Sequence, residues 1–190
     1  MRVIVDIGHA RKTGAEGNRL EEHEVSCEVS KRLVEFLRKD GHEVLELDFP
    51  RLSNTQDLEA TIREANRSGY DIGISLHCDS ASKVVEDERG KKVEVANPEA
   101  RGAHVCFYPG SAKGSRLALA IAERLCKLLP GRANKVQGRS GLAILKRTKM
   151  PFVLCECGFI TNEGDAEVMR EHPEKIAEAI REGVRDYINS

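Results

Sequence analysis

Five short apolar runs along the chain have the pattern of β-strands. Residues 2–7, 71–77 and 151–155 contain few polar interruptions, which is typical of strands buried on both faces of a parallel sheet. Residues 43–48 alternate apolar and acidic side chains, and residues 102–108 form a further apolar run that ends at a Pro-Gly turn. We predict a strand at each of these five places.

Helical periodicity fills much of the sequence between the strands. Across residues 22–39, apolar side chains recur at helical spacing, and Gly41 supplies the glycine that commonly follows a helix. Asn54 occupies the position of a helix N-cap, with Asp57 three residues later. We predict helices at residues 22–39, 54–67 and 115–129, and two short helices after the N-cap residue Asn162 that are separated at His172-Pro173.

This alternation of strands and helices predicts an α/β fold. We expect a single domain with a mostly parallel, twisted sheet and helices on both faces, because no linker or internal repeat divides the 190 residues. Residues 82–101 are strongly charged, with Gly90 between two Val-containing arms, and we expect an exposed hairpin or a flexible loop there. Residues 142–145 are expected to add a short strand.

Composition restricts the functions that such a domain can have. The formal net charge is −1, aromatic residues make up 4% of the chain and Trp is absent, so we expect no nucleic-acid partner. No apolar stretch approaches the roughly 20 residues that span a bilayer, so we expect no membrane insertion, and we predict no signal peptide. The six cysteines form no CxxC pair and most lie in apolar segments, which indicates reduced thiols and synthesis in the cytoplasm.

Two histidines stand at the ends of predicted buried strands. His9 comes after the strand at residues 2–7 and a glycine, and His77 closes the strand at residues 71–77. The carboxyl ends of parallel strands meet at one edge of a sheet, where open α/β sheets bind their ligands. If the two strands are neighbours, both imidazoles lie at that edge, and two histidines with one carboxylate form a catalytic zinc set that leaves one position for water.

The carboxylate of such a set has several candidates at the start of the first predicted helix. Glutamates cluster there, although acidic residues in a first helical turn are also favoured by the helix dipole alone. Glu22 lies three residues before the inward-facing Val25, so helical periodicity favours Glu22 over Glu21 and Glu24. His23, which is adjacent to Glu22, is an alternative ligand.

Glu156 is the candidate for a general base. It follows the apolar run at residues 151–155, so its carboxylate is expected at the carboxyl end of the sheet and partly buried. Burial raises the pKa of a carboxyl group, which suits a base that becomes an acid during one turnover. A glutamate neutralised in a structural ion pair is the alternative interpretation.

Four motifs follow one another along the chain. Residues 3–9 form an apolar run that ends in Asp-x-Gly-His, and residues 75–77 read Ser-Leu-His. Glu22 opens a helix 19 residues before Gly41, and residues 149–162 contain the closing segment around Glu156. In this order the motifs resemble the catalytic domain of zinc-dependent N-acetylmuramoyl-L-alanine amidases, which are found in bacterial autolysins and phage endolysins.

The resemblance spans nearly the whole chain and implies one zinc ion held by His9, Glu22 and His77, with Glu156 as the catalytic carboxylate. The implied partner and substrate is peptidoglycan, hydrolysed at the amide bond between the lactyl group of N-acetylmuramic acid and L-alanine. Residues 1–190 would form the zinc amidase catalytic domain without a separate cell-wall-binding domain. We expect a monomer that acts on the cell wall after release from the cytoplasm.

Other interpretations of the same residues stay open. Asp79 stands where Asn is frequent in the family, and Arg139, in a glycine-flanked loop, would either hold a stem-peptide carboxylate or be an ordinary exposed arginine. A zinc peptidase acting on another amide would use the same residues. A non-catalytic wall-binding module would share the fold but is expected to have a broken site. A nucleotide-binding domain is disfavoured, because no phosphate-binding glycine motif follows a predicted strand.

Overall fold

A six-stranded sheet forms the centre of the fold in the computed structural model, which describes residues 1–67 and 69–190. In spatial order its strands are β4 (Glu43–Leu47), β1 (Arg2–Ile7), β5 (Ile72–Asp79), β10 (Phe152–Phe159), β8 (His104–Phe107) and β9 (Val136–Gly138). The first four are mutually parallel, whereas β8 runs antiparallel to β10 and parallel to β9. The predicted α/β fold with a mostly parallel sheet is therefore confirmed.

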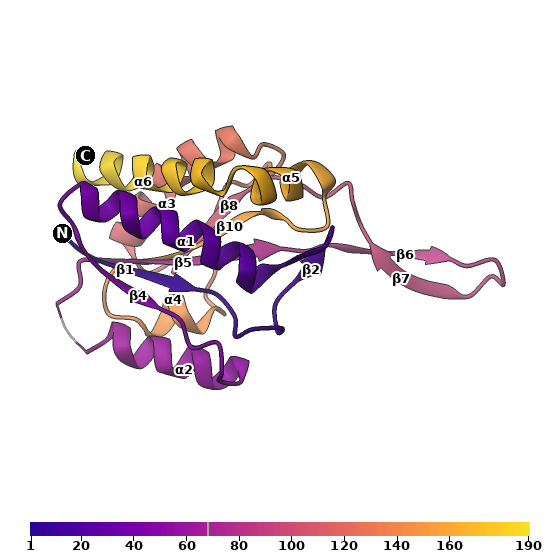
Figure 1. The fold of residues 1–190 in the computed structure, drawn as a ribbon, viewed down its shortest axis with the longest axis horizontal. Coiled ribbons are helices and arrows are strands. Elements are labelled where there is room, and N and C mark those ends of the chain that lie inside the picture. Colours follow the sequence, from indigo (N-terminus) through magenta and orange to yellow (C-terminus); the bar gives the residue numbers. More distant parts are fainter. Residues whose placement is uncertain (68) are drawn as a thin grey trace.

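Helices cover both faces of the sheet, as predicted (Figure 1). One face carries α1 (Glu22–Lys39), α3 (Ala112–Leu128), α5 (Glu163–Glu171) and α6 (Pro173–Ile188), and the other carries α2 (Asn54–Ala65) and α4 (Ala143–Arg147). Each face has its own apolar core: Val3 and Val5 pack with the α1, α3 and α6 layer, while Ile4 packs with α2 and α4. Strands buried on both faces explain the uninterrupted apolar runs of the sequence.

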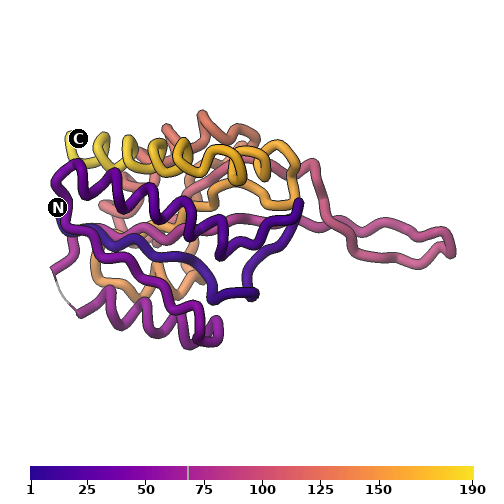
Figure 2. The backbone as a smooth tube through the Cα atoms, in the orientation of Figure 1, coloured from indigo at the N-terminus to yellow at the C-terminus, as the bar shows by residue number. Residues whose placement is uncertain are grey.

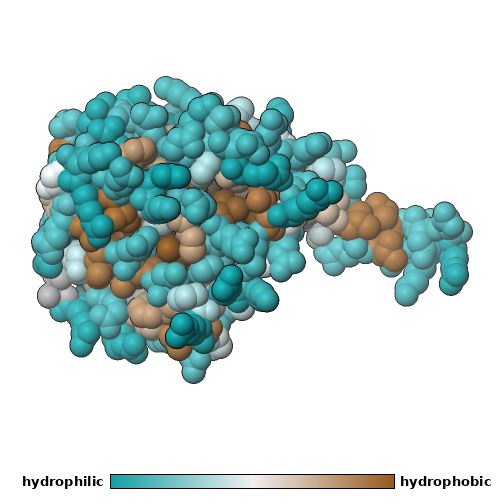
Figure 3. All heavy atoms as spheres, in the orientation of Figure 1, coloured by the Kyte–Doolittle hydropathy of each residue, from teal (hydrophilic) through white to brown (hydrophobic). Residues whose placement is uncertain are grey.

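The predicted hairpin at residues 82–101 is present and extends away from the body of the protein (Figure 2). It consists of β6 (Ser82–Glu86) and β7 (Lys92–Ala96), and Gly90 in its turn has a φ of +73°. Figure 3 shows apolar atoms gathered on the part of the hairpin near the body. Val84, Val85 and Val95 are the large apolar side chains exposed on it.

Two predicted elements near α2 and α4 are wrong in detail. Residues 142–145 are not a strand, because Leu142 is the N-cap of α4 and the next residues begin that helix. A four-residue apolar run fits a buried helix turn as well as a strand. The N-cap of α2 is Ser53 and not Asn54, since Ser53 and Gln56 form a reciprocal capping box. The side chain of Asn54 is thereby released for another contact.

The remaining differences concern the lengths of elements. β5 and β10 continue to Asp79 and Phe159, so His77 lies inside its strand and not at the end of it, and Glu156 lies inside a strand and not after one. The predicted loop before α1 contains a small ladder of β2 (Glu16–Gly17) and β3 (Leu20–Glu21), and α6 has 16 residues where a short helix was expected. All six cysteines are free thiols. Among the described residues, none of the helices combines the length and hydropathy that a bilayer crossing requires.

Candidate active site

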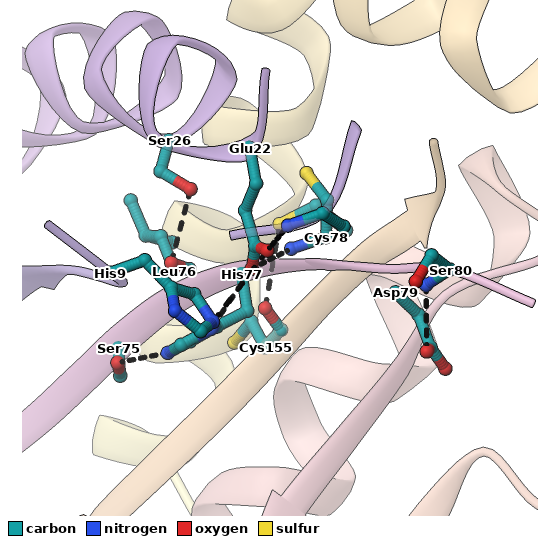
Figure 4. A network of polar contacts seen from close by, with 12 residues as sticks. His9, Glu22, Ser26, Ser75, Leu76, His77, Cys78, Asp79, Ser80 and Cys155 are labelled. Atoms are coloured by element: carbon teal, nitrogen blue, oxygen red, sulfur yellow. Dashed lines mark hydrogen bonds and ion pairs between the residues drawn. The ribbon is translucent and has the colours of Figure 1, made fainter. Parts of the chain in front are cut away.

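His9, Glu22 and His77 converge at the carboxyl edge of the sheet (Figure 4). β1 and β5 are neighbours in register, Ile7 opposite Leu76, so the histidines that follow lie side by side, with ring centroids 5.0 Å apart. Glu22 enters between them from the start of α1. Its Oε1 is 3.0 Å from His77 Nδ1, and its Oε2 is 3.6 Å from His9 Nε2.

Two glycines make room for this cluster. A Cβ atom on Gly8 would lie 2.4 Å from Cε1 of His77 and 2.6 Å from the carbonyl oxygen of Leu76, both closer than real contacts. A Cβ atom on Gly14 would lie 2.6 Å from Oε2 of Glu22. Gly8 and Gly14 are therefore required by close packing around the cluster.

The carboxylate of Glu22 is fixed by backbone donors. Its side chain is only 3% exposed, Oε2 accepts a hydrogen bond from Ala15 N at 2.6 Å, and Oε1 accepts one from Cys78 N at 2.9 Å. Burial alone would raise the pKa of Glu22, but the hydrogen bond and charge of His77 and the charge of His9 outweigh it and lower this pKa. Glu22 is accordingly an anion held between two imidazoles.

A second layer of polar side chains holds the two histidines, and sequence reasoning did not assign these contacts. His9 Nδ1 lies 3.1 Å from Asn54 Oδ1, and His77 Nε2 lies 3.1 Å from Ser75 Oγ. The Ser75 hydroxyl in turn donates to Asp6 Oδ2 at 2.5 Å. Asp6 and Ser75 are buried polar residues inside apolar strands, and such residues usually need a partner. The sequence shows these two polar residues within apolar runs, but it does not show which residues they contact.

Glu156 lies beside this cluster on β10, with its Cα opposite that of His77 in the β5–β10 register. Its Oε2 is buried and has no hydrogen-bond partner among the described residues. Burial raises the pKa of Glu156 to about 7, although the charge of His77 opposes the rise. A carboxylate with a buried, unpartnered oxygen and such a pKa is suited to exchanging protons near neutrality.

A cleft of about 260 Å³ opens between this edge and the helices α2 and α4. His9, His77 and Glu156 face it on one side. The other walls combine apolar and polar side chains, which are Leu58, Leu142, Ala143, Ile144, Leu154, Asn54, Asp57 and Thr61. The cleft thus offers a bound molecule both an apolar surface and the cluster of titratable groups.

Two other predicted candidates lie outside the cluster. Arg139 is exposed just after β9, where its backbone N donates to Phe107 O at 2.8 Å, and it does not line the cleft. The charge of Arg139 is one of the weaker influences on the pKa of Glu156, which it lowers. His23, the alternative ligand, does not join His9 and His77 but contacts Asp48, with His23 Nε2 3.1 Å from Asp48 Oδ1.

Two imidazoles and a buried carboxylate, with a further carboxylate beside them, form the donor set and base of mononuclear zinc hydrolases. Over residues 3–186 the chain matches the model of the N-acetylmuramoyl-L-alanine amidase family, and it belongs to this family. It is 30% identical to the uncharacterized protein YqiI of Bacillus subtilis, over 97% of this chain and 84% of YqiI. It is 28% identical to the N-acetylmuramoyl-L-alanine amidase LytC of the same organism, over 97% of this chain but 35% of LytC.

Solved structures resemble the fold over its whole length. The catalytic domain of the CD27L endolysin, which targets Clostridia difficile, is 26% identical with a TM-score of 0.79, over 98% of this chain and 97% of that one. The CwlD amidase of Clostridioides difficile, solved in complex with the GerS lipoprotein, is 20% identical with a TM-score of 0.81, over 99% and 98% of the two chains. At that identity, the second likeness bears on the fold alone.

Proposed function

We propose that this amidase uses one zinc ion, held by His9, Glu22 and His77, to hydrolyse the amide between the lactyl group of N-acetylmuramic acid and L-alanine in peptidoglycan. The observation that carries the proposal is the buried anion of Glu22 between two imidazoles, beside Glu156, whose Oε2 has no hydrogen-bond partner in the described part of the chain. Family membership supplies the substrate class.

The residues present fit a zinc ion. Two imidazoles and one carboxylate are common catalytic zinc ligands, and three protein ligands leave the fourth position free for water or substrate. Zinc ligands are typically oriented by hydrogen bonds to surrounding groups. Asn54 provides such a contact for His9, Ser75 provides one for His77, and the amide of Ala15 provides one for Glu22.

Glu156 performs the proton transfers in this mechanism. Zinc, when bound, supplies Lewis acidity that activates water and polarises the scissile carbonyl. Glu156 takes a proton from the attacking water and delivers it to the nitrogen of the departing L-alanine, so the carboxyl group ends the turnover ionised again. A pKa near neutrality suits both steps. The apolar wall formed by Leu58 and Leu142 helps to keep bulk water from the reacting bond.

Arg139, which lies outside the lining of the cleft, is proposed for a smaller role in substrate binding. It is exposed and close enough for its charge to act on Glu156, so it is available to a carboxylate of the stem peptide. On this proposal, Arg139→Ala raises KM severalfold and leaves kcat nearly unchanged. An unchanged KM would mean that Arg139 is an ordinary surface arginine that does not bind the substrate.

Digestion of purified peptidoglycan tests the proposed reaction. We expect new amino termini that are L-alanine only, with intact glycan strands, because glycosidic cleavage ordinarily needs a pair of opposed carboxylates. A chelator should stop the release and added zinc should restore it. New reducing sugar ends would contradict the proposal, and amino termini other than L-alanine would favour a zinc peptidase. No cleavage at all by zinc-loaded protein would favour a wall-binding module.

A further inference from the structure

A second cluster of metal-binding side chains lies close to the candidate active site without belonging to it. His23, Cys27 and Asp48 each present a donor atom, and these atoms all lie within 4.8 Å of one another. His23 and Cys27 are four residues apart on α1, so they share one face of the helix. Asp48 directly follows β4. None of the three takes part in the proposed hydrolysis.

Two of the three donor separations in this cluster are close to the edges of a tetrahedral metal site. His23 Nε2 lies 3.1 Å from Asp48 Oδ1 and 3.8 Å from Cys27 Sγ. With Zn–N and Zn–O bonds of about 2.0 Å and a Zn–S bond of about 2.3 Å, tetrahedral edges are about 3.3 Å for N–O and about 3.5 Å for N–S. Small side-chain adjustments would therefore admit a cation between the three donors.

The surroundings of the cluster also favour a cation. The His23 side chain is 7% exposed and that of Asp48 is 29% exposed, so the site is sheltered but has an entrance from solvent. The carboxylate of Asp48 supplies negative charge beside the thiol of Cys27. A divalent cation bound there would neutralise this charge and displace the thiol proton.

An ordinary ion pair explains only part of the arrangement. A charged His23 beside Asp48 would account for their contact at 3.1 Å. The sulfur of Cys27, on the same face of α1, lies 3.7 Å and 3.8 Å from the two ring nitrogens and adds a third donor beside this pair. Cys27 also differs from the other five cysteines, which are fully buried, because it alone is partly accessible.

We propose that His23, Cys27 and Asp48 bind a second divalent cation of the thiophilic kind, with Zn²⁺ the best match to one nitrogen, one sulfur and one oxygen donor. This cation joins the first turns of α1 to the end of β4. Because His23 follows Glu22 directly, the cation also fixes the helix start that carries Glu22. The site is independent of the proposed reaction, since it shares no ligand with the cluster of His9, Glu22 and His77.

Cobalt substitution separates the two sites, because only the second contains sulfur. Thiolate ligands give Co²⁺ a near-ultraviolet charge-transfer absorption that imidazole and carboxylate ligands do not give. We expect the metal-free protein to bind two equivalents of Co²⁺ and to develop this absorption. Cys27→Ser should bind one equivalent and lose the absorption, and Asp48→Asn should bind the second equivalent at least tenfold more weakly.

Cys126→Ser is the matched control. Cys126 is a buried thiol that donates to Ala103 O at 3.1 Å, a bond that a serine hydroxyl keeps, so both equivalents and the absorption should persist. Circular dichroism of each variant verifies that it is folded. Absence of the absorption from the wild-type protein, or its survival in folded Cys27→Ser, would overturn the proposal.

His77→Ala distinguishes failure of this proposal from failure of the proposed function. That variant should lose one equivalent of Co²⁺ and keep the charge-transfer absorption, because its sulfur-containing site is intact. If His77→Ala and the wild-type protein both bind a single equivalent with the absorption, the second site stands and the first does not bind metal. A single equivalent without the absorption, lost in His77→Ala, supports the first site alone.

Discussion

β5 leads into the two regions of the molecule that differ most. Near its end His77 joins a buried cluster in which Glu22 contacts two imidazoles and two backbone amides. A few residues later the chain leaves the body as the β6–β7 hairpin, whose side chains are nearly all exposed. In the cluster each side chain is held by several specific partners, whereas the hairpin is held mainly by its backbone ladder. Substitutions should therefore have very different effects in the two regions.

The largest contrast is expected from truncating one side chain in each region. His77→Ala removes a proposed ligand, so the variant should fail to retain stoichiometric zinc. Its wall-degrading activity should fall by more than about 10³-fold, which is more than the loss expected when only a hydrogen-bond partner of a ligand is removed. Val84→Ala, at a hairpin position that is 65% exposed, should change neither. Metal analysis and turbidity assays measure both. Full zinc content in His77→Ala would remove it from the ligand set.

A smaller contrast concerns buried and exposed carboxylates. The folded state raises the pKa of Glu156 to about 7 from 4.5. Folding thus favours the neutral form of the Glu156 carboxyl group. Its contribution to the free energy of unfolding is complete below about pH 4.5 and is lost as the pH rises through about 7. In chelator, the free energy of unfolding of the wild-type protein relative to Glu156→Gln should fall by up to about 3 kcal/mol between these limits.

Denaturant unfolding at pH 5 to 8 measures this difference. Glu88→Gln, at an exposed position in the hairpin turn, is the matched control, and its unfolding free energy should run parallel to that of the wild-type protein. Parallel behaviour of Glu156→Gln as well would contradict the burial of an ionisable group on β10.

Glycine substitutions should separate packing from backbone strain. Gly8→Ala places a methyl group 2.4 Å from the His77 ring and should cost about 1–3 kcal/mol of stability together with weaker zinc binding. Gly90→Ala in the hairpin meets no atom within 4 Å and is opposed only by its φ of +73°, so it should cost about 1 kcal/mol and leave zinc binding intact. Unchanged zinc affinity in Gly8→Ala would contradict the close packing around His77.

The smallest effect is expected from removing the hairpin itself. Ser82 and Ala96 are paired, so Asn-Gly in place of residues 83–95 would close the ladder with a two-residue turn. The free energy of unfolding should change by less than about 0.5 kcal/mol, because few buried contacts are lost. Calorimetry or denaturant unfolding checks this. A much larger loss would mean that the hairpin helps to stabilise the body.

The elements that were predicted well are those with a large buried face. The bounds of α1 follow from its apolar spacing and from Gly41. The strand before His9 and the strand that carries His77 follow from apolar runs that only a doubly covered sheet requires. Periodicity also placed Glu22 on the inward face of α1, and the structure brings it between the two histidines.

What could not be predicted depends on tertiary contacts. Ser53 and Asn54 are both good N-cap residues, and the choice of Ser53 accompanies the contact of Asn54 with His9 across 45 residues of sequence. The apolar residues 142–145 fit either a strand or a helix turn until α4 packs beneath β10. The contact between Asp6 and Ser75 joins neighbouring strands, so no local pattern reveals it.

The zinc content and turnover of Glu156→Gln test the central claim most directly, because they separate the base from the ligands. Glutamine keeps the size of Glu156 but cannot take up the water proton. We predict one zinc ion in the candidate active site, as in the wild-type protein, and a fall in kcat of ~10²–10⁴-fold. Near-normal kcat with zinc bound would contradict the role of Glu156 as the base, and loss of this zinc would make Glu156 a ligand instead.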